Sequence, residues 1–557
     1  MEAHDPTVSS EDGEHSTVAS NSNPEKQDGF EAEPASDSAT DYATGLRLFL
    51  IMFTLSMSGL LTALEIGIIA TAIPAITDDF HAIDDVGWYG SATFLVTAAT
   101  SALWGKVYKY LNVKFAYLAS IAIFLIGSIV AATAPNSVAV IIGRAIQGLG
   151  ITGTMNGSII VINYVSHPKR HPMLIGIWTG IFMLSTILGP IVGGALTSGV
   201  SWRWCFYINL PLGAPIVVLL LLFLRVPKHI KPTPATWKEI ILQLDLPGFT
   251  FILGSLVCFI LALQWGGQTK AWNNGSVIAT LVLWISFNII FVFVESFQGA
   301  RAMVPLRLVR PRMTWINALW SFTSNAALYQ ALFYLPIYFQ SIHNQSAIIS
   351  GVNSIPFLAF FGVGALASGT VVKKTRLLQP YQLISALMMT AGMALLYTLD
   401  INSSKARYVG AEVLLGVAVG FGNQIPMMAV QGLSKFEDVA SSTGIMFTAQ
   451  SGSAAYFIVV AQSIFANRML QTLKATAPYL SPELVLGTGA SELYQVFSGD
   501  DLAAVHGAYM TGIQDVFACG LAGSAFAALL ALVIPWKQKL PDHDSQKAGE
   551  KGATVSV

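Results

Sequence analysis

Long apolar segments recur along most of this chain, and they constrain its fold more than any other feature. Each is close to the roughly twenty residues that a helix needs to cross a bilayer. About fourteen are predicted, at 47–73, 86–108, 115–134, 137–164, 172–199, 205–226, 245–266, 275–296, 313–341, 349–372, 380–400, 408–430, 439–466 and 510–535. Backbone groups inside lipid must be satisfied within the segment, so such segments form helices. The sequence therefore predicts an all-α polytopic membrane protein embedded in the lipid bilayer.

The composition excludes several other classes of protein. Hydrophobic residues make up 54% of the chain and charged residues 11%, too few charges to cover soluble domains of this length. No phosphate-cradling glycine loop, nucleophile elbow or pair of metal-spaced histidines occurs, and the three cysteines are far apart. We expect no enzyme activity, no cofactor, no metal and no nucleic-acid partner.

The two ends of the chain are polar. Residues 1–46 hold eleven acidic residues against one basic residue, Lys26, and too little apolar area to fold. They are predicted to form a disordered acidic tail, and 537–557 to form a second tail. No cleavable signal peptide is visible. The acidic segment is interpreted as a solvated spacer, with a regulatory role as the alternative.

Basic residues predict the orientation of the spans. If the amino terminus lies inside, most lysines and arginines of the connecting loops also lie inside, which favours cytoplasmic placement of both termini. Glycosylation acceptor triplets begin at Asn274, Asn344 and Asn402, and all three fall on loops predicted to be outside. A glycoprotein of a eukaryotic secretory pathway is therefore expected.

Two charged residues stand out because an ionisable group inside a bilayer is energetically costly. Glu65 in the first span and Arg144 in the fourth both lie about 10–12 Å below the outer side, at 1.5 Å per residue. They could pair or face one water-filled cavity. Gln147 and Gly148 share the helix face of Arg144. We interpret Glu65 as a group that takes and releases a proton under the influence of Arg144, with a purely structural ion pair as the alternative.

Glycine and proline are concentrated in the fifth span. Gly189 and Gly193 lie four residues apart, so both fall on one helix face and allow close approach of a neighbouring backbone. Pro190 can bend the helix, and Gly194 adds a further small residue. This segment indicates a closely packed, moving part of the protein, with a static packing motif as the alternative.

Other polar and aromatic residues within the spans suit a broad apolar cavity with scattered hydrogen-bonding groups. The cavity candidates are Asn156, Trp178, Asn325, Tyr329, Gln330 and Gln424. Packing of polar groups between helices is the alternative for these residues. Three further acids, Glu295, Glu412 and Asp515, lie near span ends, where each is expected to reach water, with a role in transport as the alternative.

Three segments, in order, resemble signatures of the major facilitator superfamily, in particular the fourteen-span drug:proton antiporters of fungi. Residues 64–74 (LEIGIIATAIP) are similar to the span-one signature, with Glu65 where many relatives carry aspartate. Residues 143–150 (GRAIQGLG) resemble the span-four signature, whose arginine is implicated in proton coupling. Residues 189–194 (GPIVGG) resemble the antiporter signature of span five. The resemblance covers nearly all of 46–536.

One signature of that family is degraded here. The loop between spans two and three keeps Gly105, but Lys109 stands where relatives have aspartate, and Asn112 and Val113 replace glycine and arginine. In relatives the aspartate belongs to a charge network that stabilises one conformation. We therefore expect this protein to stabilise its outward-facing state differently or to switch more loosely.

The resemblance implies a major facilitator fold arranged as 6 + 2 + 6 helices. The implied parts are an amino-terminal half at 47–226, two extra helices at 227–300 and a carboxy-terminal half at 301–536. Span five is implied to pack between the halves. The two halves would rock about a central site and exchange protons for a small, mostly apolar organic compound. A monomeric efflux pump in the plasma membrane is expected, with the vacuolar membrane as the alternative location. The functional alternatives are uptake of an iron-siderophore and a non-transporting sensor.

Overall fold

Helices account for nearly all of the regular structure in the computed structural model, which describes residues 42–80, 86–167, 170–227, 232–435, 438–490 and 492–536. Within those ranges no sheet forms, and a single isolated bridge joins Gly266 and Lys270. The all-α prediction is confirmed. Apart from residues 42–46, the predicted tails fall outside the described residues. Ala43 is buried, and its N–H donates to the Val165 carbonyl oxygen over 2.9 Å. The first helix begins at Gly45, inside the predicted amino-terminal tail.

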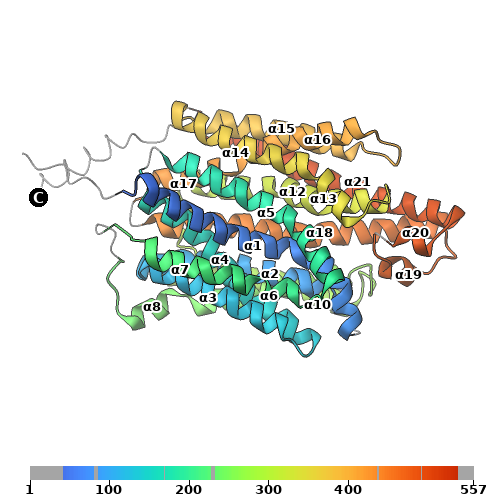
Figure 1. The fold of residues 1–557 in the computed structure, drawn as a ribbon, viewed down its shortest axis with the longest axis horizontal. Helices are drawn as coiled ribbons and strands as arrows, with labels where there is room; N and C mark the ends of the chain where they lie inside the picture. The colour runs from blue at the N-terminus through green and yellow to red at the C-terminus, as the bar shows by residue number, and fades with distance from the viewer. Residues whose placement is uncertain are drawn as a thin grey trace, which may run out of the picture. The chain divides into compact units, whose positions relative to one another are not determined.

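The first group of helices contains six of the predicted spans (Figure 1). They are α1 (Gly45–Phe80), α2 (Val86–Tyr110), α3 (Val113–Ala132), α4 (Ser137–Val165), α5 (His171–Gly199) and the pair α6 (Trp204–Tyr207) and α7 (Asn209–Phe223). Asparagine side chains cap two of them: Asn112 accepts from the Lys114 N–H at the start of α3, and Asn136 accepts from the Ala139 N–H at the start of α4. The Asn112 of the degraded signature is thus a helix cap.

The middle of the chain forms two long helices and several short ones. They are α8 (Trp237–Gln243), α9 (Leu246–Trp265), α10 (Gly275–Gln298), η3 (Gly299–Arg301) and α11 (Leu306–Val309). Helices α9 and α10 pack on each other, and α9 also contacts α2 and α18. The extra pair therefore touches a helix of each half.

The last group contains the remaining six spans, two of which are broken into shorter helices. They are α12 (Arg312–Ser341), α13 (Ala347–Asn353), α14 (Ile355–Thr375), α15 (Gln379–Tyr397), α16 (Lys405–Asn423), α17 (Ile425–Leu433), α18 (Val439–Thr476), α19 (Pro482–Gly487), α20 (Leu493–Val496) and α21 (Gly499–Val533). A proline follows each break, because proline cannot donate a helical hydrogen bond and clashes with the preceding turn.

Hydropathy located the helices well but not all of their ends. Eleven helical stretches among the described residues are long and apolar enough to cross a membrane. The other three predicted spans are α2, α12 and α15, which are long helices with more polar residues. Helix α18 runs ten residues beyond its predicted span, and α21 begins eleven residues before its predicted start. Hydropathy does not detect these extensions because they are polar.

Several helix contacts join the first and last groups, and two of them are extensive. Helix α5 lies between α1 and α14, and α2 packs against α18 (Figure 1). Near the Lys109 end of α2 the second contact is very close, since a Cβ on Gly105 would lie 2.8 Å from the Ala440 carbonyl oxygen and 3.1 Å from the Gly444 Cα. At this end of the bundle, α2 and α18 therefore leave no room for a side chain between their backbones.

Candidate functional site

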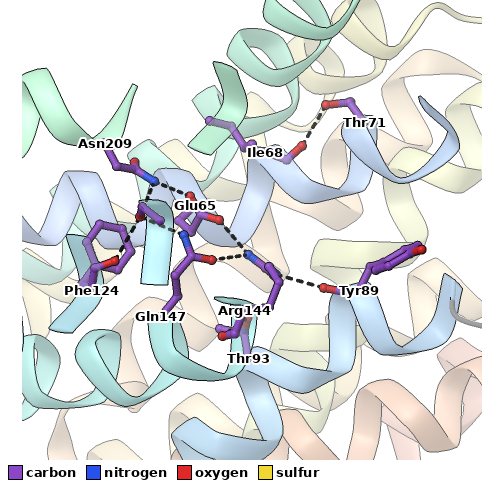
Figure 2. A network of polar contacts seen from close by, with 10 residues as sticks. Glu65, Ile68, Thr71, Tyr89, Thr93, Phe124, Arg144, Gln147 and Asn209 are labelled. Carbon is purple, nitrogen blue, oxygen red and sulfur yellow. Dashed lines mark hydrogen bonds and ion pairs between the residues drawn. The ribbon is translucent and has the colours of Figure 1, made fainter. Parts of the chain in front are cut away.

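A buried ion pair joins Glu65 of α1 to Arg144 of α4, as Figure 2 shows. The Arg144 Nη1 donates to the Glu65 Oε1 over 2.7 Å, and neither side chain has any exposed surface. The structure thus brings together the two charges that the depth argument placed at one level. In a low-dielectric interior a close, hydrogen-bonded partner is what makes two buried charges tolerable.

Glycines hold the backbone of α4 close to its neighbours and so position Arg144. A Cβ on Gly143 would lie 2.6 Å from the Ala131 N of α3, and one on Gly148 would lie 2.5 Å from the Thr93 carbonyl oxygen of α2. Small residues allow this approach in membrane helices. The Arg144 Nε then reaches the Tyr89 carbonyl oxygen of α2 over 2.9 Å.

Polar side chains complete the surroundings of Glu65. The Asn209 Nδ2, at the start of α7, donates to the Glu65 Oε2 over 2.7 Å and lies 3.1 Å from the Ser128 Oγ. Gln147, predicted to share the face of Arg144, donates from Nε2 to the Ser128 Oγ over 2.9 Å and accepts from the Arg144 Nη1 over 3.5 Å. Side chains of α4 and α7 therefore contact the Glu65 carboxylate, and Ser128 of α3 links Asn209 to Gln147.

Sequence reasoning missed two members of this network. Asn209 and Ser128 are polar residues inside otherwise apolar predicted spans, and that isolation is the one signal that could have identified them. Serine commonly satisfies its hydroxyl within its own helix, as Ser128 also does by donating to the Phe124 carbonyl oxygen over 3.0 Å. Its presence in a span therefore did not distinguish it from the other serines.

The ion pair can couple a proton to a change in packing. The two carboxylate oxygens accept from different helices, since Oε1 faces Arg144 and Oε2 faces Asn209. Protonation of Glu65 would remove the charge that compensates Arg144, whose Nη2 has no hydrogen-bond partner among the described residues. The arginine would then favour a different arrangement of α1, α4 and α7.

Gly189 and Gly193 of α5 lie against α1, whereas Gly176 and Gly180 of the same helix lie against α14 of the last helix group. A Cβ on Gly189 would lie 2.5 Å from the Gly67 Cα, and one on Gly193 would meet the Thr71 hydroxyl and the Ile68 carbonyl. The expectation that this segment packs between the two halves is wrong for these two residues, because the face of α5 that carries them is turned towards α1. Pro190 lies inside the helix, next to this contact.

Gly189 and Gly194 offer a matched test of that contact. We expect Gly189→Ala to force α1 and α5 apart and to reduce the thermal stability of the purified protein by several degrees. Gly194→Ala should change it little, because nothing lies within 4 Å of a Cβ at that position. Thermal unfolding in detergent measures both variants. Equal melting temperatures would contradict close α1–α5 packing at Gly189.

The six cavity candidates are dispersed, and several have hydrogen-bond partners within the bundle. Asn156 donates to the Ser101 carbonyl oxygen over 3.0 Å, and Trp178 donates to the Leu55 carbonyl oxygen over 3.1 Å. Asn325 donates to the Ser321 carbonyl oxygen of its own helix over 2.7 Å, and Tyr329 is half-buried. Gln330 is buried, and its side-chain amide has no hydrogen-bond partner among the described residues. Gln424, at the break between α16 and α17, donates to Thr179 of α5 over 2.7 Å and so links the two helix groups.

A pocket of about 290 Å³ lies elsewhere, between α9 and α18. Its lining residues are Leu263, Trp272, Val460, Ser463, Ile464, Asn467 and Gln471, and none of the six cavity candidates is among them. The cavity assignments therefore stay predictions.

The three predicted glycosylation sites are exposed, each in a connection between helices. Asn274 caps α10 by accepting from the Ser276 N–H, Asn344 follows α12, and Asn402 lies between α15 and α16. These positions are accessible to modification, and glycosylation stays a prediction.

Lys109, which departs from the family signature, forms an ion pair that joins the two helix groups. Lys109 Nζ lies 3.1 Å from the Asp438 Oδ1, just before α18, and Arg307 Nη2 lies 2.9 Å from the same oxygen. Asp438 is almost fully buried, while Arg307 is largely exposed. Lys109 lies on α2 and Asp438 lies next to α18, so their ion pair strengthens the contact between these two helices near Gly105.

Known proteins resemble the chain over most of its length. The family model described as Major Facilitator Superfamily matches residues 55–458. A protein named dehydrocurvularin exporter, from Alternaria cinerariae, is 62% identical over 557 residues, which covers 100% of this chain and 95% of that protein. One of the same name from Aspergillus terreus is 64% identical and covers 94% and 90%. Efflux pump notK, from Aspergillus sp. (strain MF297-2), is 59% identical and covers 90% and 89%.

Solved structures of low sequence identity share the fold. The proton:xylose symporter XylE superposes with a TM-score of 0.59 at 14% identity, covering 88% of this chain and 97% of that one. The human organic anion transporter MFSD10 superposes with a TM-score of 0.57 at 13% identity, covering 88% and 100%.

Proposed function

The chain belongs to the major facilitator superfamily, and we propose that it exports a small, mostly apolar organic compound in exchange for protons. Membership makes it a multi-pass membrane transporter and not an enzyme. The observation that carries the coupling part of the proposal is the fully buried pair of Glu65 and Arg144. A titratable carboxyl deep among membrane helices, beside one cation, is suited to carry a proton across.

Export is supported by the relatives at 59–64% identity, whose names all describe exporters or efflux pumps. Two of those names specify dehydrocurvularin, so this compound is the first substrate to test. The alternative of iron-siderophore uptake gains no support from these relatives. A non-transporting sensor likewise has no observation in its favour.

Proton entry can supply enough free energy for export against a gradient. Moving one elementary charge down 100 mV yields about 2.3 kcal/mol. At about 1.4 kcal/mol per tenfold, this supports a concentration ratio of roughly fifty-fold for a neutral compound. In the proposed cycle Glu65 accepts a proton from outside, and the halves then reorient and release it inside.

The proposed setting is the plasma membrane, with both termini in the cytoplasm and the protein acting as a monomer. In this orientation the Lys109 end of α2 is cytoplasmic, and the exposed Asn274, Asn344 and Asn402 face outside. The close approach of α2 and α18 at Gly105 then corresponds to a closed cytoplasmic side.

Retention of dehydrocurvularin in cells tests direction and substrate together. We expect yeast cells that express the protein to retain several-fold less of the added compound than cells that carry an empty vector. Cells expressing Arg144→Ala at the same membrane level should retain as much as the vector control. Greater retention in expressing cells would indicate uptake, and equal retention would remove this compound as the substrate.

A further inference from the structure

Glu412 of α16 is a second fully buried carboxyl, and it lacks the partners that Glu65 has. It has no exposed surface, and neither of its side-chain oxygens has a hydrogen-bond partner within the part of the chain that the structure describes. None of the salt bridges among the described residues includes it. The expectation that it reaches water near the end of its span is therefore wrong, because α16 packs against α14, α15 and α12 around it.

The position of Glu412 corresponds to that of Arg144 in the other half. Arg144 lies seven residues after Ser137, the first residue of α4, and Glu412 lies seven residues after Lys405, the first residue of α16. A glycine follows four residues later in each helix. Gly148 contacts the Thr93 backbone of α2, and Gly416 contacts the Phe357 backbone of α14.

These matches indicate a repeat, because α2 and α14 are each the second spanning helix of their own half. Helices α4 and α16, each the fourth spanning helix of its half, also run in the same direction if every span crosses the membrane. Glu412 thus lies about 10 Å along its helix, at the depth of Arg144 and on the same side.

The titratable groups near Glu412 do not supply a counter-charge. The Tyr408 phenol, one turn earlier on α16, is the group that interacts electrostatically with it. Tyr338 of α12 bonds to the Asp400 carbonyl oxygen, and His343 bonds to the Tyr338 hydroxyl. Asp400 lies in the connection before α16 and Arg407 lies in the first turn of α16, and no salt bridge between described residues joins Arg407 to Glu412.

We propose that Glu412 is a second proton-carrying residue of the transport cycle, located in the carboxy-terminal half. A carboxylate without a donor or a cation is strongly disfavoured in such surroundings, so Glu412 holds its proton in the cytoplasm-closed structure. In the cycle, one proton from outside water forms the O–H bond. That bond breaks, and the proton passes to cytoplasmic water, when the halves reorient. The role rests on the proposed proton antiport.

Infrared spectroscopy tests the protonation of Glu412 independently of transport. The difference spectrum between wild type and Glu412→Gln at neutral pH is expected to contain the carbonyl stretch of one protonated carboxylic acid. Glu412→Gln keeps the size and neutrality of the protonated side chain, so the variant should fold. A carboxylate band in place of the acid band would overturn the proposal.

The number of protons moved per substrate tests the role in transport. In vesicles containing purified protein, we expect Glu412→Gln to move one proton fewer per substrate than wild type. Glu295→Gln is the matched control, because Glu295 is also buried, contrary to the expectation that it reaches water, but its Oε2 accepts from the Val304 N–H. The proton-to-substrate ratio of this variant should equal that of wild type. An unchanged ratio in Glu412→Gln would make its proton purely structural. Absence of proton flux in wild type would instead contradict the antiport itself.

Discussion

Arg144→Ala is expected to abolish proton-coupled export and to destabilise the protein. The change leaves the Glu65 carboxylate fully buried with no cation, and breaking a buried pair in this way costs about 3–5 kcal/mol. Part of this free energy lowers the stability of the folded protein, and part disfavours the present arrangement of α1, α4 and α7. We expect export per molecule in the membrane to fall by roughly a hundred-fold, since 1.4 kcal/mol is tenfold. Vesicle export and thermal unfolding measure the two effects.

Replacing both charged residues by neutral ones distinguishes the effect on stability from the effect on proton coupling. The double variant Glu65→Gln/Arg144→Gln leaves no uncompensated charge, so we expect it to regain much of the stability lost in Arg144→Ala. Its export should no longer be coupled to a proton at Glu65, because no titratable group is left at this site. If Arg144→Ala retained full proton-coupled export, the proposed role of the pair would be wrong.

Asp438→Asn is expected to open the cytoplasmic side. Asp438 is almost fully buried between Lys109 and Arg307, and the substitution leaves those two cations without their shared anion. Because the two remaining cations are partly or largely exposed, we expect the loss to cost about 1–2 kcal/mol, between an exposed pair and a fully buried one. We expect a cysteine at position 440, which lies against Gly105, to react about tenfold faster with a membrane-impermeant reagent applied from the cytoplasmic side. Cys205, Cys258 and Cys519 are replaced beforehand.

Asp515→Asn is the control for the loss of one acidic charge. Its partner Arg468 lies 2.9 Å away, but both side chains are substantially exposed, and such pairs contribute about 0–1 kcal/mol. Labelling at position 440 should therefore stay at the wild-type rate. Equal labelling rates in Asp438→Asn and wild type would show that the cluster of Lys109, Arg307 and Asp438 does not keep the cytoplasmic side closed.

Features that depend on one helix at a time could be predicted from the sequence. Span positions follow from hydropathy, and the common depth of Glu65 and Arg144 follows from counting residues along two helices. The close packing of Gly189 and Gly148 follows from the absence of a side chain. None of these predictions requires knowledge of which helix lies next to which.

Features that depend on helix neighbours could not be predicted. Nothing in the sequence near Gly189 specifies α1 as its contact, and Lys109 and Asp438 are separated by 329 residues. Asn209 could be assigned to the Glu65 network only after the start of α7 was located beside α1. Glu412 was expected near water because its distance from the span end was visible, whereas its enclosure by three other helices was not.

Proton movement driven by substrate tests the central claim most directly. Wild-type protein is reconstituted into vesicles with a pH-sensitive dye and no imposed proton gradient, and dehydrocurvularin is then added on one side. The account predicts that substrate crossing the membrane moves protons in the opposite direction, and that Glu65→Gln removes the part of this proton flux that Glu65 carries. Substrate transport by wild type without any proton movement, or an equal proton flux in Glu65→Gln, would contradict it.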